Sequence, residues 1–204
     1  MTTLTLEKEV LGAAEIAPLT VEQYHRMLEA GILEDGEPVE LLDGLLVQKI
    51  RGEAMTVSPR HRLAVGLLAE LGKRLEGSGV HLQLQGPVTI EPRNEPEPDG
   101  LVVLGAIKDY ADRHPGPADI TCAIEVADSS LRRDRTWKQR IYAGAGVAQY
   151  LLVNLIDRQV EVYEAPDPGA GRYRSRADLK PGEEVALLLA GGERLAVPVE
   201  SLLP

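Results

Sequence analysis

The sequence predicts a protein of the α/β or α+β class, in which helices pack on a central mixed sheet. Two continuous apolar runs, at residues 100–105 and 120–127, are typical of central strands that are covered on both faces. Three longer segments, at residues 19–31, 58–79 and 131–146, have the features of helices. Because helix-like and strand-like segments are interspersed along the chain, helices flanking a mixed sheet are the expected arrangement.

The composition is that of an ordinary globular protein. The chain has 204 residues, of which 44% are hydrophobic and 26% are charged, so it is long enough to bury a substantial core. No Phe is present, and the core must therefore rely on aliphatic residues. The formal net charge of −10 argues against non-specific binding to nucleic acid or to an anionic membrane, although a basic face can occur on an acidic protein.

Two further features bear on domain organisation and location. The chain has one cysteine, Cys122, which cannot form an internal disulfide, and its first residues lack the pattern of a signal peptide. Its apolar runs are far shorter than the ~18 residues that a membrane span needs. We therefore expect a cytoplasmic protein with no membrane partner. Residues 1–17 read as a flexible arm and residues 18–204 as a single domain.

The first half of the predicted domain has clear local signals. Thr20 and Gln23 form a capping-box pattern at the start of the helix over 19–31. Asp43 and Gly44 separate two short apolar runs and favour a two-residue hairpin turn. Ser58 is a candidate N-cap for the next helix. The apolar stripe of that helix is predicted to consist of Leu63, Leu67, Leu68, Leu71 and Leu75.

The second half is richer in strands. Residues 80–90 alternate like a bent strand or a strand pair. Residues 148–155 and 159–165 are predicted to pair through a turn at Asp157 and Arg158, and residues 173–204 contain further strand-like pieces. The domain is therefore expected to end in extra C-terminal strands.

Two acids stand at the ends of predicted central strands. Asp99 precedes one strand in the stretch "EPEPDG", and Glu125 lies within the other, "CAIEVA". An acid inside a buried strand is costly unless it is paired or binds a cation, and two converging carboxylates are a typical site for Mg²⁺. The alternative is that Asp99 caps a turn and Glu125 points outward. In either case Glu95 and Glu97 are expected to be solvated loop acids.

The predicted helix that follows Glu125 is strongly basic. Asp134 and Lys138 are four residues apart and share a helix face, which Tyr142 continues. Two interpretations remain open: an exposed helix with a surface acid–base pair, or a helix whose Lys138 projects toward the carboxylates. On the second interpretation a polyanion would be contacted by Arg132, Arg133 and Arg135.

Several common chemistries have no motif in this sequence. It contains no GxxxxGK[ST] loop and no GxGxxG after a strand, so nucleotide binding lacks support. It contains no CxxC or HExxH pattern and no GxSxG elbow, which removes the usual zinc sites and the common serine-hydrolase arrangement.

The stretches "EPEPDGLVVL" and "AIEVADSSLRRDRTWKQRIYAGAGVAQYLLVNLIDRQVEVYEAP", with "VELLDGLLVQKI" before them, resemble a known family. It is a family of putative restriction endonucleases, formerly a domain of unknown function, in the PD-(D/E)xK nuclease superfamily. The resemblance covers roughly residues 20–200. It implies a restriction-endonuclease-like fold, with the active site at one end of a mixed sheet.

The resemblance also implies roles for individual residues. Asp99 and Glu125 would bind Mg²⁺, or Mn²⁺ in its place, with help from a backbone carbonyl of Val126 or Ala127. The lysine that the superfamily pattern has two residues after the acid is absent, because position 127 is Ala. Lys138 would take its place. Glu40 and His61 match positions that recur in the family and are further candidate catalytic residues.

The implied activity is that of a Mg²⁺-dependent DNA endonuclease, acting as a homodimer on the two strands of DNA. Phosphates that flank the cleaved bond would be contacted by Arg132, Arg133 and Arg135. The alternative is a catalytically inactive relative that uses the same fold as an interaction or regulatory module. The net charge and the missing lysine at position 127 favour this alternative to some degree.

Overall fold

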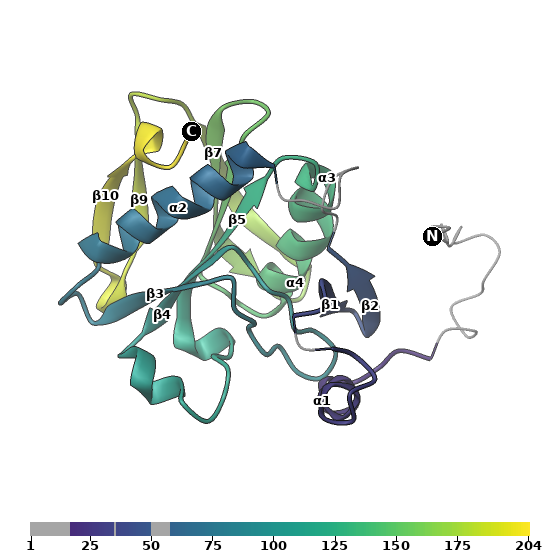
Figure 1. Ribbon diagram of the computed structural model, residues 1–204. Helices are drawn as coiled ribbons and strands as arrows, with labels where there is room; N and C mark the ends of the chain where they lie inside the picture. Colours follow the sequence, from purple (N-terminus) through teal and green to yellow (C-terminus); the bar gives the residue numbers. More distant parts are fainter. Residues whose placement is uncertain (1–16, 35, 50–57) are drawn as a thin grey trace.

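A six-stranded mixed sheet is the centre of the molecule (Figure 1). The computed structural model describes residues 17–34, 36–49 and 58–204; all but one residue of the predicted arm lie outside these ranges. In spatial order the strands are β3 (Val80–Leu84), β4 (Gly100–Leu104), β5 (Ile120–Ala127), β6 (Gln149–Asn154), β7 (Gln159–Asp167) and β8 (Arg172–Leu179). Strands β5 and β6 are parallel, and all other neighbours in the sheet are antiparallel. The predicted fold class is confirmed.

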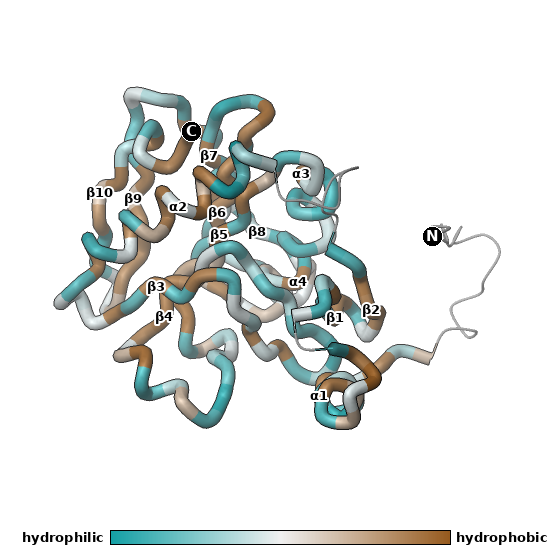
Figure 2. The backbone as a smooth tube through the Cα atoms, in the orientation of Figure 1, coloured by the Kyte–Doolittle hydropathy of each residue, from teal (hydrophilic) through white to brown (hydrophobic). Residues whose placement is uncertain are grey.

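The alternation of side chains along β5 separates two cores. Cys122, Ile124 and Val126 join the core beneath helix α2 (Pro59–Arg74) and the hairpin of β9 (Glu184–Leu188) and β10 (Arg194–Pro198). Figure 2 shows the long apolar stretches that β9 and β10 contribute. Ala123 and Ala127 join the other core, beneath the crossover that connects β5 to β6. Glu125 has the same parity and therefore faces the crossover.

The N-terminal elements form as their local signals predict. Helix α1 (Val21–Glu29) begins with the expected capping box: Gln23 N–H donates to Thr20 Oγ1 and Thr20 N–H donates to Gln23 Oε1. The hairpin of β1 (Val39–Leu42) and β2 (Leu45–Gln48) turns at Asp43 and Gly44, whose φ angles are 52° and 78°. Two positive φ angles are what a type I′ hairpin turn requires.

Helix α2 begins as predicted and buries three of the five predicted leucines, but the N-terminal end of its buried stripe is shifted. Ser58 Oγ accepts a hydrogen bond from the backbone N–H of His61, and Leu68, Leu71 and Leu75 are buried. Leu63, however, is 54% exposed and Ala64 is fully buried in its stead. The buried stripe has the spacing 64, 68, 71, 75, and Leu63 lies about 100° away from it around the helix.

The predicted helix over 131–146 is interrupted. It consists of α3 (Leu131–Arg133), a π-helical turn (Asp134–Lys138) and α4 (Gln139–Gly144). Of the predicted strand-like region 80–90, only the first half forms a strand. None of the helices in the described ranges has the length and apolarity to cross a membrane. Short 3₁₀ turns occur at Ile107–Tyr110, Pro117–Asp119, Ala190–Gly192 and Val199–Ser201.

Candidate active site

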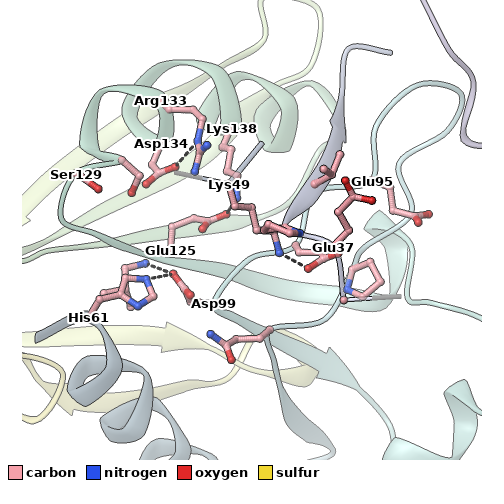
Figure 3. Close-up of a pocket in the computed structure, with 18 of the residues that line it drawn as sticks. Glu37, Lys49, His61, Glu95, Asp99, Glu125, Ser129, Arg133, Asp134 and Lys138 are labelled. Atoms are coloured by element: carbon pink, nitrogen blue, oxygen red, sulfur yellow. Dashed lines mark hydrogen bonds and ion pairs between the residues drawn. The ribbon is translucent and has the colours of Figure 1, made fainter. Parts of the chain in front are cut away.

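The pairing of β4 with β5 brings the two predicted acids together. Gly100 pairs with Ile124, so Asp99 and Glu125 stand side by side where the two strands meet the crossover. Both line a pocket of about 700 Å³, and Figure 3 shows Asp99 beside His61 and Glu125 beside Lys138. His61 from the first turn of α2 and Lys138 from the π-helical turn line the same pocket.

Asp99 is held on one side only. Its Oδ2 accepts a 2.8 Å hydrogen bond from the backbone N–H of Val126 and lies 3.2 Å from His61 Nε2. Burial lowers the pKa of His61, but the hydrogen bond to the Asp99 carboxylate and the negative charges of Asp99, Asp128 and Asp134 together outweigh burial. They raise this pKa above its ordinary value. Asp99 Oδ1 accepts no hydrogen bond from any residue in the described ranges and stays available to a ligand in the pocket.

Lys138 reaches Glu125, one of the two acids of the helix-face hypothesis, and Glu40 is the second acid that it contacts. Its Nζ lies 2.8 Å from Glu125 Oε1 and 3.0 Å from Glu40 Oε2, and all three side chains are almost completely buried. The Tyr142 hydroxyl donates to the same Glu125 Oε1 at 3.0 Å. Glu40, on strand β1, also accepts a 3.3 Å hydrogen bond from the backbone N–H of Glu97. The hairpin, the sheet and the crossover thus meet at one ammonium group.

Burial and charge shift the pKa values of this cluster in a consistent way. Burial raises the pKa of Glu125 to about 8; Lys138 opposes this, and nearby carboxylates such as Asp134 add to it. Burial alone would lower the pKa of Lys138, but the charges of Glu125 and Glu40 hold it well above its usual value. The lysine is therefore a permanent cation that sits between acids.

The three arginines of the predicted DNA-binding set differ in their positions. Arg132 is exposed, and Arg133 lines the pocket with its Nη1 3.9 Å from Glu40 Oε1. Arg135 does not line the pocket, because its guanidinium is bound by Glu161, with Nε 2.9 Å from Glu161 Oε1. The structure thus brings Arg133 to the site and directs Arg135 elsewhere.

The expectation that Glu95 and Glu97 are solvated loop acids is wrong. Glu95 is only 3% exposed, and its carboxylate contacts His25 Nε2 at 2.8 Å and accepts a 2.8 Å hydrogen bond from Thr89 Oγ1. Glu97 is half-buried and forms an ion pair with Lys49. These partners come from other parts of the chain, so nothing local in "EPEPDG" indicated the burial.

Asp128 is a residue near the site that the sequence did not single out. Its Oδ2 accepts a 2.8 Å hydrogen bond from Ser58 Oγ, the N-cap of α2, and it lines the pocket. This bond ties the first turn of α2, and with it His61, to the end of β5. Its position directly after the strand was the only available signal.

The donor set fits a hard divalent cation held in part by water. Asp99 and Glu125 each have one carboxylate oxygen, Oδ1 and Oε2, that accepts no hydrogen bond from the described residues. Within the described ranges no cluster of three or more His, Cys, Asp or Glu side chains is arranged to hold a metal ion. Mg²⁺ often binds through one or two carboxylates and keeps several waters, so two free oxygens suffice for it.

The chain matches the Uma2 family, described as putative restriction endonuclease, over residues 21–198. It belongs to this family. A crystal structure of a putative nuclease of DUF820 from Anabaena variabilis is similar to it, with a TM-score of 0.65 and 14% sequence identity over 91% of this chain and 97% of that one. At this identity the likeness shows the fold. A search among curated proteins finds no match. The resemblance on which the residue roles were based is confirmed.

Proposed function

We propose that the protein is a Mg²⁺-dependent DNA endonuclease that hydrolyses phosphodiester bonds at the Asp99–Glu125 pair, with Mn²⁺ able to replace Mg²⁺. One observation carries the proposal: Lys138 Nζ lies 2.8 Å from Glu125 Oε1. This contact supports an arrangement of two acids and a lysine like that of the superfamily pattern, although position 127 is Ala.

Each side chain has a distinct part in the proposed reaction. Asp99 and Glu125 would hold the cation with the oxygens that Lys138, Tyr142, His61 and the Val126 amide leave free. When bound, the cation would polarise the scissile phosphate and lower the pKa of a water.

Lys138 supplies fixed positive charge at the same place. Its ammonium is bound by Glu125 and Glu40, so it keeps one orientation without the entropy cost of ordering a mobile side chain during the reaction. It would orient the attacking water and stabilise the negative charge that develops on the phosphate. His61, 3.2 Å from Asp99, would hold that carboxylate in place.

The charges around the pocket bear on how DNA binds. Among the described residues eight acids line it, against three Lys and Arg side chains. Such a pocket repels phosphate unless a cation is bound. Arg132 and Arg133 would contact phosphates flanking the scissile one, which positions DNA without reading its sequence.

The remaining parts of the proposal concern the whole protein. We expect the region 18–204 to act as one domain in the cytoplasm, with residues 1–17 as a flexible arm. We also expect a homodimer, because two antiparallel DNA strands suit a two-fold pair of sites.

Plasmid cleavage with Mg²⁺ or Mn²⁺ tests the activity. We expect wild type to nick or linearise supercoiled DNA and Glu125→Gln to abolish this. Glu184→Gln is the matched control, because Glu184 is an exposed strand residue outside the pocket. If wild type and Glu125→Gln cut equally on supercoiled, linear and single-stranded DNA, the catalytic proposal is refuted.

Calorimetry with Mn²⁺ separates the enzyme from the inactive relative. A binding isotherm that disappears in Glu125→Gln and persists in Glu184→Gln would support the metal site. Absence of binding in wild type, together with absence of cleavage, would favour the interaction or regulatory module instead.

A further inference from the structure

Lys138 lies in an unusual stretch of helix. Within the turn Asp134–Lys138 the hydrogen bonds are π-helical, and the backbone N–H of Gln139 donates to the carbonyl of Asp134 five residues earlier. Such turns are rare, occur mostly as single interruptions of α-helices, and are frequent at functional sites. This one places Lys138 at its last position, directly above Glu125.

A buried tyrosine holds the first residue of the π-turn. The Tyr150 hydroxyl, on strand β6, donates to the carbonyl oxygen of Asp134 at 3.1 Å. Tyr150 is fully buried, so this hydroxyl has no water to replace its acceptor. The bond joins the start of the π-turn to the strand that pairs in parallel with the strand of Glu125.

A buried carboxylate holds the second residue. Arg135 places its Nε and Nη2 on Glu161, at 2.9 and 2.5 Å, and its Nη2 also lies 3.2 Å from Asp157. Glu161 is fully buried on β7 and has a lowered pKa: burial would raise it, but the hydrogen bonds from Arg135 and other donors outweigh burial. A forked, charge-assisted contact of this kind constrains orientation as well as distance.

The turn is therefore fixed to two strands of the sheet just before Lys138. A lysine side chain is long and flexible, and its Nζ stays against two acids only if its Cα is held at the right height and rotation. Neither Tyr150 nor Arg135 forms a hydrogen bond or ion pair with Glu125 or Glu40, and neither lines the pocket. Both act on the backbone that carries the lysine.

We propose that Tyr150 and Arg135 are positioning residues, which hold the π-turn so that Lys138 Nζ is fixed against Glu125 and Glu40. The effect on catalysis rests on the proposed nuclease function; the effect on the position of Lys138 does not. Arg135, expected from the sequence to contact DNA, is thereby assigned to the sheet through Glu161.

The test uses the full chain and two readouts. The first is the rate at which an N-hydroxysuccinimide ester labels Lys138 in the folded, metal-free protein, measured by peptide mass spectrometry relative to the exposed Lys73. It needs no enzyme activity. The second is the kcat and KM for plasmid nicking, because a group that acts in the transition state changes kcat and leaves KM unchanged.

Tyr150→Phe is the main variant and Tyr173→Phe is its matched control. Tyr173 is also buried, stacks on Tyr150, and donates its hydroxyl to a backbone carbonyl at 2.9 Å, but that carbonyl belongs to Val147, beyond α4. Losing one buried hydrogen bond corresponds to about a fivefold effect. In Tyr150→Phe we expect Lys138 to be labelled about fivefold faster, and kcat to fall about fivefold with KM unchanged. In Tyr173→Phe we expect both the labelling rate and kcat to stay within about twofold of wild type.

Glu161→Gln removes the second anchor independently. We expect it to raise Lys138 labelling about tenfold, because the bond it weakens is charge-assisted. Equal labelling in Tyr150→Phe, Tyr173→Phe and wild type, or unchanged labelling in Glu161→Gln, would overturn the proposal. If the labelling changes as expected while wild type cuts no DNA, the positioning of Lys138 stands and the nuclease function fails.

Discussion

Replacing Lys138 with Met tests the buried charge cluster through stability alone. Methionine has a similar length and no charge, so the change removes the ammonium while filling most of the space. Glu125 Oε1 and Glu40 Oε2, which lie 2.8 and 3.0 Å from Nζ, then lose their shared counter-charge. Breaking a buried ion pair from one side costs about 3–5 kcal/mol. For a chain of this size about 4 kcal/mol lowers Tm by about 8–16 °C.

The cost of Lys138→Met depends on pH in a defined direction. Burial already raises the pKa of Glu125 from its ordinary 4.5 to about 8, so the folded state binds a proton that the unfolded state releases. That contribution is complete below pH 4.5 and is lost as the pH rises toward 8. Without Lys138 this pKa rises further. The destabilisation should therefore be largest above about pH 8 and smallest near about pH 5.

Urea unfolding of four proteins provides the measurement: wild type, Lys138→Met, Glu40→Gln and the double variant. Because both residues belong to one cluster, their effects on the free energy of unfolding should be non-additive by more than about 1 kcal/mol. Free energies that add to within about 0.5 kcal/mol, or a cost for Lys138→Met that does not grow between about pH 7 and about pH 9.5, would refute the reasoning.

Three further changes probe other parts of the structure. Glu161→Gln should weaken the loss of stability at acid pH. The lowered pKa of Glu161 stabilises the wild-type protein, and this stabilisation is lost as the pH falls below about 4.5. Urea midpoints at about pH 3 to 6 would refute this if the variant lost as much stability as wild type. Gly44→Ala should cost about 1–3 kcal/mol, since Gly44 has a φ of 78° and a Cβ there would lie 2.5 Å from Pro18 Cβ; an unchanged Tm would contradict this. DNA binding measured by fluorescence anisotropy should need a divalent cation, either Mg²⁺ or Ca²⁺, in wild type and be lost in Asp99→Ala. Equal binding in EDTA would argue against a cation-dependent site.

The parts of the fold that could be predicted from sequence are those with local causes. The Thr20–Gln23 capping box and the Asp43–Gly44 turn each depend on residues within a few positions of one another. The buried strand around Glu125 was indicated by its continuous apolar run. The approach of Lys138 to the acids could be stated as a hypothesis, because helical spacing puts it on the face that Tyr142 continues.

The parts that could not be predicted depend on distant partners. Glu95 is buried because His25, seventy positions away in the chain, covers its carboxylate. The π-turn contains no Pro or Gly that would indicate an interrupted helix, and Tyr150, which holds it, lies on strand β6. Arg135 looked like a DNA contact because its buried partner Glu161 comes from another strand of the sheet.

Ala127 is fully buried and packs as ordinary core at the position where the superfamily pattern has its lysine. Glu125 and the lysine that contacts it, Lys138, are instead thirteen residues apart. The chain between them must leave the sheet and enter the π-turn in the right register. The length of this connection is thus as essential to the site as its side chains. Inserting or deleting a single residue within the helical turns from Leu131 to Lys138 would rotate Lys138 by about 100° around the helix axis and turn it away from Glu125.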